Sequence, residues 1–160
     1  MSKYRKKRTV LVIEDNDLNR EILCEMLFPD YFVLQAENGK TGLKLLEENE
    51  TRISLILLDI QMPVMNGYEF LDAVRDKPEY ANIPIIITTS SAAATDEIKC
   101  LESGATDFVS KPYNPDVVLK RVASMIRLSE SSSLINKVEH DAYGLFKQKV
   151  STSTGKNAGR

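Results

Sequence analysis

The sequence predicts an α/β domain in which a doubly wound sheet of five parallel strands carries helices on both faces. Short apolar runs alternate five times with segments of helical periodicity, which indicates buried parallel strands joined by right-handed crossovers. Polar residues stand at the carboxyl ends of several of these runs, where open α/β sheets bind their ligands. The 160 residues, 42% of them hydrophobic, allow one domain with a proper core and additional segments.

Five short apolar or β-branched runs are the predicted strands: Thr9–Ile13, Phe32–Leu34, Leu55–Leu58, Ile83–Ile87 and Thr106–Ser110. The third run is the most apolar, and it ends at a single carboxylate, Asp59. Pro84 stands near the start of the fourth run, where a missing backbone N–H does little harm. Because a charged group beside an apolar strand costs free energy unless it has partners, the partners of Asp59 are the central question.

A helix is predicted after each strand: from Asp17 to near Pro29, through Leu43–Leu46, from about Asn66 to Arg75, up to Ser103, and from Pro115 to about Leu128. Asp17 is the expected N-cap of the first helix. Asn38-Gly39 is interpreted as a turn, and Gly104 as the left-handed residue that ends the fourth helix. Asn114-Pro115-Asp116 supplies a cap, a proline at the first helical position and an acid near the positive helix end.

Composition excludes several classes of function. The net charge of -2 argues against a chain that coats nucleic acid, and no apolar run approaches the roughly 18 residues of a membrane span. Cys24 and Cys100 match no metal-binding spacing and fall on apolar helix faces, which indicates reduced core residues in a cytoplasmic protein. His140 is the only histidine, so we expect no His-based catalysis in the predicted pocket. The glycines form no nucleotide-binding motif.

The polar residues at the strand ends converge on one pocket, because the carboxyl ends of parallel strands meet at one edge of a sheet. They are Glu14, Asp15, Asp59, Thr89 and Lys111. Three carboxylates repel one another unless a cation holds them, and oxygen ligands with room for water suit Mg²⁺. A divalent cation, a lysine and a hydroxyl are the equipment of phosphoryl transfer, in which a carboxylate can accept the phosphoryl group.

The chain from Thr9 to about Leu128 resembles the receiver domain of two-component response regulators. The residues Asp59-Ile60-Gln61-Met62-Pro63-Val64-Met65-Asn66-Gly67 follow the family's D-x-x-M-P-x-M-x-G motif. The acidic pair Glu14-Asp15, Thr89 and Lys111-Pro112 stand at the expected separations. The resemblance implies a flavodoxin-like sheet with strand order 2-1-3-4-5 and a cis peptide bond at Lys111-Pro112.

The resemblance also implies the chemistry. Asp59 would accept a phosphoryl group from a sensor histidine kinase or a phosphotransfer protein. Glu14, Asp15, Asp59 and the backbone carbonyl of Gln61 would hold Mg²⁺. Lys111 would neutralise one phosphoryl oxygen, and Thr89 would donate a hydrogen bond to another. Glu14 stands where the family more commonly has Asp, which keeps the charge and leaves open whether a water intervenes before the metal.

Regulatory features are implied as well. Thr89 would move toward the phosphoryl group and allow the ring of Phe108 to turn inward; because Phe108 lacks a hydroxyl, we expect an inward bias without phosphate. Gln61 and Ser91 occupy positions that tune the attack of water on the acyl phosphate. Lys99, Asp107 and Arg121 resemble the charged set with which some relatives dimerise through the fourth helix, fifth strand and fifth helix, although an ordinary set of surface charges is the alternative.

Two other functions fit part of this pattern. A phosphatase of the haloacid dehalogenase type also phosphorylates an aspartate beside Mg²⁺, but it needs a second acid two residues later, where this chain has Gln61. A receiver that binds partners without accepting phosphate usually lacks one of the acids or the lysine, and this chain retains them. The expected role is therefore a signalling phosphoacceptor without enzymatic turnover of other molecules.

Three segments are expected along the chain. Residues 1–8 form a basic arm that we interpret as a solvated tail, residues 9–128 the receiver domain, and residues 129–160 a linker helix with a polar tail. In the last segment, Leu134, Val138, Asp141 and Leu145 are spaced like a heptad seam that carries one charge. The chain is either a stand-alone regulator or the front part of a longer one, since no DNA-reading pattern follows Leu128.

Overall fold

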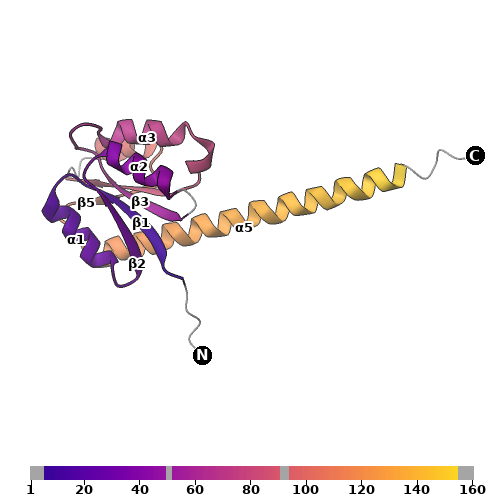
Figure 1. Cartoon of the computed structure of the whole chain (residues 1–160), viewed down its shortest axis with the longest axis horizontal. Helices are drawn as coiled ribbons and strands as arrows, with labels where there is room; N and C mark the ends of the chain where they lie inside the picture. The colour runs from indigo at the N-terminus through magenta and orange to yellow at the C-terminus, as the bar shows by residue number, and fades with distance from the viewer. Residues whose placement is uncertain (1–5, 50–51, 91–93, 155–160) are drawn as a thin grey trace, which may run out of the picture. The chain divides into compact units, whose positions relative to one another are not determined.

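The computed structural model describes residues 6–49, 52–90 and 94–154. Its centre is a sheet of five parallel strands in the order β2-β1-β3-β4-β5, which is the order that the resemblance implied (Figure 1). The strands are β1 (Arg8–Ile13), β2 (Tyr31–Ala36), β3 (Ile53–Asp59), β4 (Ile85–Thr89) and β5 (Asp107–Ser110). The helices are α1 (Asp17–Leu27), α2 (Gly39–Glu48), α3 (Gly67–Arg75), the short 3₁₀ helix η1 (Pro78–Tyr80), α4 (Ala94–Glu102) and α5 (Pro115–Thr154).

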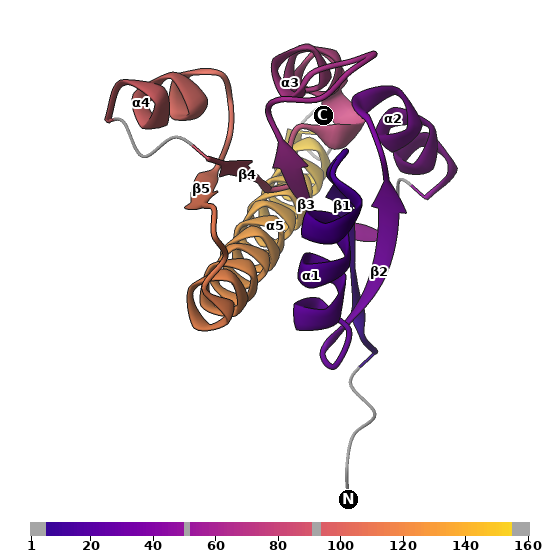
Figure 2. The ribbon, with the colours of Figure 1, turned by 90° about the vertical axis from the view of Figure 1, so that its left-hand side faces the viewer.

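Side chains that alternate along the central strands form two separate apolar cores. Leu11 and Ile13 of β1 belong to a core with α2, α3, η1 and α4, whereas Val10 and Val12 belong to a core with α1 and the first part of α5. Figure 2 shows α2 and α3 on one side of the sheet and α1 on the other. Both faces of the sheet are thus covered, which explains why its strands read as continuous apolar runs.

Two helix starts differ from the expectations. Asn16, not Asp17, caps α1: its side chain accepts a hydrogen bond from the backbone N–H of Asn19, and Asp17 is already in the first turn. Asn38 is likewise the N-cap of α2, with its side chain accepting from the N–H of Thr41, so Asn38-Gly39 begins a helix directly. Asn and Asp are almost equally good caps, and the sequence alone does not rank two adjacent ones.

The sequence predicted that the last helix would end near Leu128, and this prediction is wrong. The helix continues without a break to Thr154. The serines that interrupt the apolar pattern are accommodated because their hydroxyls donate to the carbonyl four residues earlier: Ser132 to Leu128 and Ser133 to Ser129, both at 3.0 Å. The chain divides into two compact units, Met1–Ile126 and Arg127–Arg160, and the described part of the second is the remainder of α5.

Arg75, the last residue of α3, links three segments of the first unit. Its Nε and Nη2 donate to the carbonyl of Gly104 at 2.9 and 2.6 Å, and Nη1 donates to the carbonyls of Ala81 and Ile83. Gly104 has a φ of 94°, the left-handed conformation expected after α4. These bonds hold the end of α4 against α3 and so fix the start of β5.

Candidate functional site

The acidic residues predicted for the pocket come together at the carboxyl edge of the sheet. Glu14 and Asp15 follow β1, and Asp59 is the last residue of β3, the strand next to β1. One carboxylate oxygen from each of the three lies within 4.8 Å of the others. Asp15 is exposed, whereas the side chains of Glu14 and Asp59 are only 1% and 6% exposed.

Lys111, which follows β5, is the cation of this pocket. Its Nζ lies 2.9 Å from Oε2 of Glu14 and 3.4 Å from Oδ1 of Asp59. A backbone hydrogen bond of 2.7 Å from the N–H of Lys111 to the carbonyl of Thr89 fixes its main chain to the end of β4. The peptide bond between Lys111 and Pro112 is cis, as the resemblance implied.

The pocket changes how readily its groups ionise. The pKa of Asp59 is raised from 3.8 to about 7, mainly by burial and next by the charge of Glu14, while Lys111 opposes the shift. Burial by itself lowers the pKa of Lys111, but its bonds with Glu14 and Asp59 leave that pKa above the usual value. One lysine therefore does not neutralise the carboxylates, and the all-oxygen donor set fits a hard divalent cation such as Mg²⁺.

Glu14 is held by more donors than the sequence indicated. The backbone N–H of Asn16 donates to its Oε1 at 3.1 Å, and the phenol of Tyr113 donates to its Oε2 at 3.2 Å. Nη1 of Arg20 donates to its backbone carbonyl at 2.7 Å. Sequence reasoning missed Tyr113; the available signal was a hydroxyl-bearing ring directly after Lys111-Pro112 at a strand end.

The loop after Asp59 is shaped by close backbone packing. The N–H of Gly67 donates to the carbonyl of Ile60 at 2.9 Å, and a Cβ on Gly67 would lie 2.5 Å from the carbonyl oxygen of Asp59. Asn66 and Glu69 form a capping box that starts α3 at this point. Gly67 is therefore the residue that permits α3 to begin directly against the backbone of Asp59.

The predicted switch and tuning residues occupy the following places. Thr89 ends β4 beside Ser110 of β5. Phe108 is half-buried and packs against the apolar core that contains Leu11 and Ile13. Gln61 is exposed two residues after Asp59, and Ser91 lies outside the described residues. The movement of Thr89, the inward bias of Phe108 and the role of Gln61 stay predictions.

Two of the three charged residues assigned to the dimer surface contact each other within the chain. Nη1 of Arg121 lies 3.1 Å from Oδ1 of Asp107 and also donates to the carbonyl of Phe108. Lys99 instead places its ammonium 4.7 Å from the ring centre of Tyr68. Asp107 and Arg121 therefore form an internal ion pair, which a dimer would have to share or exchange.

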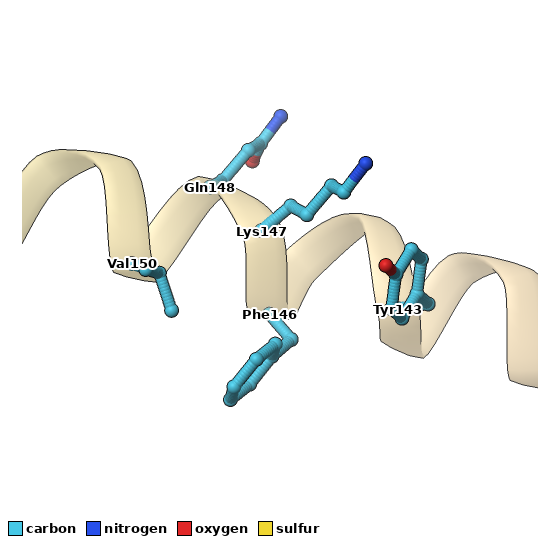
Figure 3. A pocket seen from close by; sticks show the side chains of 5 residues that line it. All are labelled: Tyr143, Phe146, Lys147, Gln148 and Val150. Carbon is cyan, nitrogen blue, oxygen red and sulfur yellow. The ribbon is translucent and has the colours of Figure 1, made fainter.

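The second part of α5 carries a hollow of its own. Its lining residues are Tyr143, Phe146, Lys147, Gln148 and Val150. Figure 3 shows that all of them project from one helix and that Phe146 and Lys147 point to opposite sides. A single helix has no second wall to enclose a ligand, so the acidic pocket is the better candidate site. Within the described part of the chain, no helix is both long and apolar enough to cross a membrane.

The fold and the pocket together define a signalling domain of the α/β class with an acidic site at the sheet edge. The family model of the response regulator receiver domain matches residues 10–123, and the chain belongs to this family of two-component signalling domains. The acidic cluster of Glu14, Asp15 and Asp59 lies at the family's phosphorylation site.

Individual relatives agree with this assignment. The chain is 34% identical to the two-component response regulator ORR5 of Oryza sativa, over 74% of this chain and 88% of that protein. It is 36% identical to the sensor histidine kinase CheAY of Helicobacter pylori over 78% of this chain, and it spans only 16% of that kinase's length. The receiver domain of the sensor histidine kinase PA1611 of Pseudomonas aeruginosa, whose structure has a magnesium ion coordinated in the active-site cleft, is 26% identical with a TM-score of 0.66; the match covers 75% of this chain and 98% of that one.

Proposed function

We propose that this chain accepts a phosphoryl group onto Asp59 from a phosphohistidine of a sensor histidine kinase or a phosphotransfer protein. An Oδ of Asp59 attacks phosphorus, the bond from phosphorus to the imidazole nitrogen breaks, and the imidazole keeps the electron pair and takes up a proton. The observation that carries the proposal is the position of Asp59: a buried acid, raised in pKa, between a second acid and a lysine.

The residues present fit the Mg²⁺ ion that receiver domains use. Glu14, Asp15, Asp59 and the backbone carbonyl of Gln61 would hold it, and the ion would supply positive charge that offsets the repulsion between acceptor and phosphoryl oxygens. Lys111 already contacts Asp59 and would neutralise a further phosphoryl oxygen. Thr89, at the neighbouring strand end, would donate a hydrogen bond to the phosphorylated side chain.

The test is chemical labelling of the folded chain. With acetyl phosphate and Mg²⁺, mass spectrometry should find one labile phosphoryl group on Asp59, and beryllofluoride should bind to the same site. Asp59→Asn should abolish both, whereas Asp72→Asn, which alters an exposed acid of α3, should change neither. Labelling or beryllofluoride binding that survives Asp59→Asn would show that another group is the acceptor.

Two alternatives have weaker support. A receiver that never accepts phosphate is disfavoured because both buried acids and Lys111 are in place. A phosphatase would need an acid at the position of Gln61, which is an exposed amide. Release of phosphate from phosphate monoesters by the wild-type chain, lost in Asp59→Asn, would favour the phosphatase.

The output of phosphorylation is proposed to pass through α4, β5 and the first part of α5. Thr89 would shift toward the phosphoryl group. The ring of Phe108 would then turn further inward, into the space that Thr89 leaves. Substitution of Gln61 or of Ser91 should change the lifetime of the acyl phosphate with little effect on Mg²⁺ affinity. A lifetime that stays the same in both variants would remove these two residues from the mechanism.

The whole protein's role depends on what accompanies residues 9–128. We propose that they are the receiver domain and that residues 129–160 connect it, through the second part of α5, to a partner or an output domain. Residues 1–5 of the expected basic arm lie outside the described residues, and Arg8 belongs to β1.

A further inference from the structure

We propose that Tyr113 is a positioning residue of the metal site: its phenol holds the carboxylate of Glu14 in the orientation in which Glu14 and its neighbours receive Mg²⁺. The inference rests on the proposed function for the use of the metal, but its geometry is independent of phosphorylation. It concerns one hydrogen bond of 3.2 Å, between residues 99 positions apart in the chain.

The ring of Tyr113 is held in place by backbone geometry and packing, independently of its hydroxyl. Tyr113 lies between the cis bond of Lys111-Pro112 and Asn114, whose carbonyl accepts the N–H of Val118 in the first turn of α5. Its ring packs against the apolar core that contains Val10, Val12 and Val118. A half-buried ring anchored in this way presents its hydroxyl to Glu14 with little remaining freedom.

The three donors to the Glu14 carboxylate differ in how firmly they are held. The N–H of Asn16 belongs to the backbone at the start of α1, and the phenol of Tyr113 is attached to a packed ring. The third donor, the Lys111 ammonium, ends a flexible side chain and is shared with Asp59. Lys111 and Tyr113 both contact Oε2 of Glu14. If Lys111 moves away, Tyr113 therefore still holds the carboxylate.

This arrangement matters because the partners that orient a metal ligand contribute to metal affinity. Glu14 is almost fully buried, and a carboxylate that lost its fixed donors would either rotate toward Lys111 or remain partly unpaired. Tyr113 prevents both because it keeps Oε2 in place when Lys111 moves toward Asp59. Its hydroxyl donates to Oε2 of Glu14, so we place its effect on the metal site in the orientation of that carboxylate.

The test uses Mg²⁺ alone and the full chain. In isothermal titration calorimetry, Tyr113→Phe should weaken Mg²⁺ binding by about tenfold, the size typical for loss of a group that orients a ligand. Tyr143→Phe removes the phenol of an exposed tyrosine on α5 and should leave the affinity unchanged. Equal affinities of the wild type and Tyr113→Phe would overturn the proposal, as would tighter binding by the variant.

A second comparison separates positioning from a general structural effect. The rate of Asp59 labelling by acetyl phosphate should fall in Tyr113→Phe at low Mg²⁺ and return to the wild-type value at saturating Mg²⁺. In a Glu14→Gln background, Tyr113→Phe should have no further effect on Mg²⁺ affinity, because the carboxylate that Tyr113 orients is no longer present. A loss of rate that saturating Mg²⁺ does not restore, or the same loss of affinity in both backgrounds, would overturn the proposal.

A third measurement uses the wild-type chain and therefore needs no substitution that could disturb folding. With ¹³C-labelled tyrosine, the resonance of the ring carbon that bears the Tyr113 hydroxyl should shift when Mg²⁺ is added, and that of Tyr143 should not. An unmoved Tyr113 resonance at saturating Mg²⁺ would overturn the proposal. Because the calorimetry and the ¹³C resonance follow Mg²⁺ and not the acyl phosphate, failure of Asp59 to become labelled would refute the proposed function without affecting these two readouts.

Discussion

Lys111 lies closer to Glu14 than to Asp59: its Nζ is 2.9 Å from Oε2 of Glu14 and 3.4 Å from Oδ1 of Asp59. In this structure the lysine thus balances the charge of Glu14 first and that of Asp59, the proposed phosphoacceptor, second. A cation that entered the acidic cluster would compete with Lys111 for Glu14. The lysine would then be available to the phosphoryl group on Asp59, which connects metal binding to acceptor chemistry.

Removal of the Lys111 charge should destabilise the metal-free protein. In Lys111→Met, Glu14 and Asp59 lose the cation that pairs them, and a buried charge left without its partner costs roughly 3–5 kcal/mol. Lys77→Met breaks the exposed pair of Lys77 and Glu47, whose Nζ and Oε1 are 3.1 Å apart, and should cost much less because both partners stay in water. Urea unfolding in EDTA at pH 8 measures both; a similar cost for the two variants would contradict the buried-pair argument.

The stability of the metal-free protein should depend on the ionisation of Asp59. Its folded pKa of about 7 exceeds the ordinary value of 3.8, so the folded state keeps a proton that the unfolded state has released. Stability from this group is present at low pH and is lost as the pH rises through about 7. Asp59→Asn lacks this loss, so its stability relative to the wild type should increase between pH 5 and pH 8 by roughly 1–3 kcal/mol.

Denaturant unfolding in EDTA across this pH range gives the comparison directly. Asp72→Asn, in the exposed part of α3, serves as the control and should follow the wild type. A constant difference between Asp59→Asn and the wild type at all pH values would show that the pKa of Asp59 is not raised in the folded chain.

Addition of one methyl group at Gly67 should disturb the loop that follows Asp59. In Gly67→Ala, the new Cβ would meet backbone atoms, at 2.5 Å from the Asp59 carbonyl and 2.8 Å from Cα of Ile60, and backbone cannot move aside as a flexible side chain can. We expect a loss of about 1–3 kcal/mol in stability and slower labelling of Asp59. Gly144→Ala, where a Cβ has nothing within 4 Å, should be neutral or stabilise α5.

Thermal unfolding and acetyl phosphate labelling measure these two effects. If Gly67→Ala labels as fast as the wild type and melts at the same temperature, the contact between α3 and the Asp59 loop is looser than the structure indicates.

Reversal of the Asp107 charge should reveal whether α4, β5 and α5 form a dimer surface. Asp107→Arg replaces the internal ion pair with Arg121 by a repulsion and removes a charge that a second copy would exchange. We expect sedimentation of the beryllofluoride-bound wild type to show a dimer and that of Asp107→Arg a monomer, with both monomeric before activation. A dimer formed by a mixture of Asp107→Arg and Arg121→Asp chains, neither of which dimerises alone, would show that the charges pair between chains; a monomeric activated wild type would contradict the dimer surface.

The order of strands and helices could be predicted because apolar periodicity is a local property. The runs at Thr9–Ile13 and Leu55–Leu58 are strands in the structure because they are apolar on both faces, and the sheet is covered on both sides. Predictions failed where the decision depends on small local differences or on context. Two adjacent candidates for a cap precede α1, and the serines after Leu128 bond back to their own helix instead of ending it.

The sequence by itself determined which residues reach the carboxyl edge of the sheet: Glu14, Asp15, Asp59, Thr89 and Lys111 each stand where a strand ends. Only the tertiary structure decided which of these residues contact one another and how their environment changes their ionisation. The closer contact of Lys111 with Glu14, the raised pKa of Asp59 and the reach of Tyr113 to Glu14 depend on register, ring packing and burial across separate elements. Periodicity and spacing describe neighbours along the chain, whereas ångström distances between residues 99 positions apart are set only when the core packs.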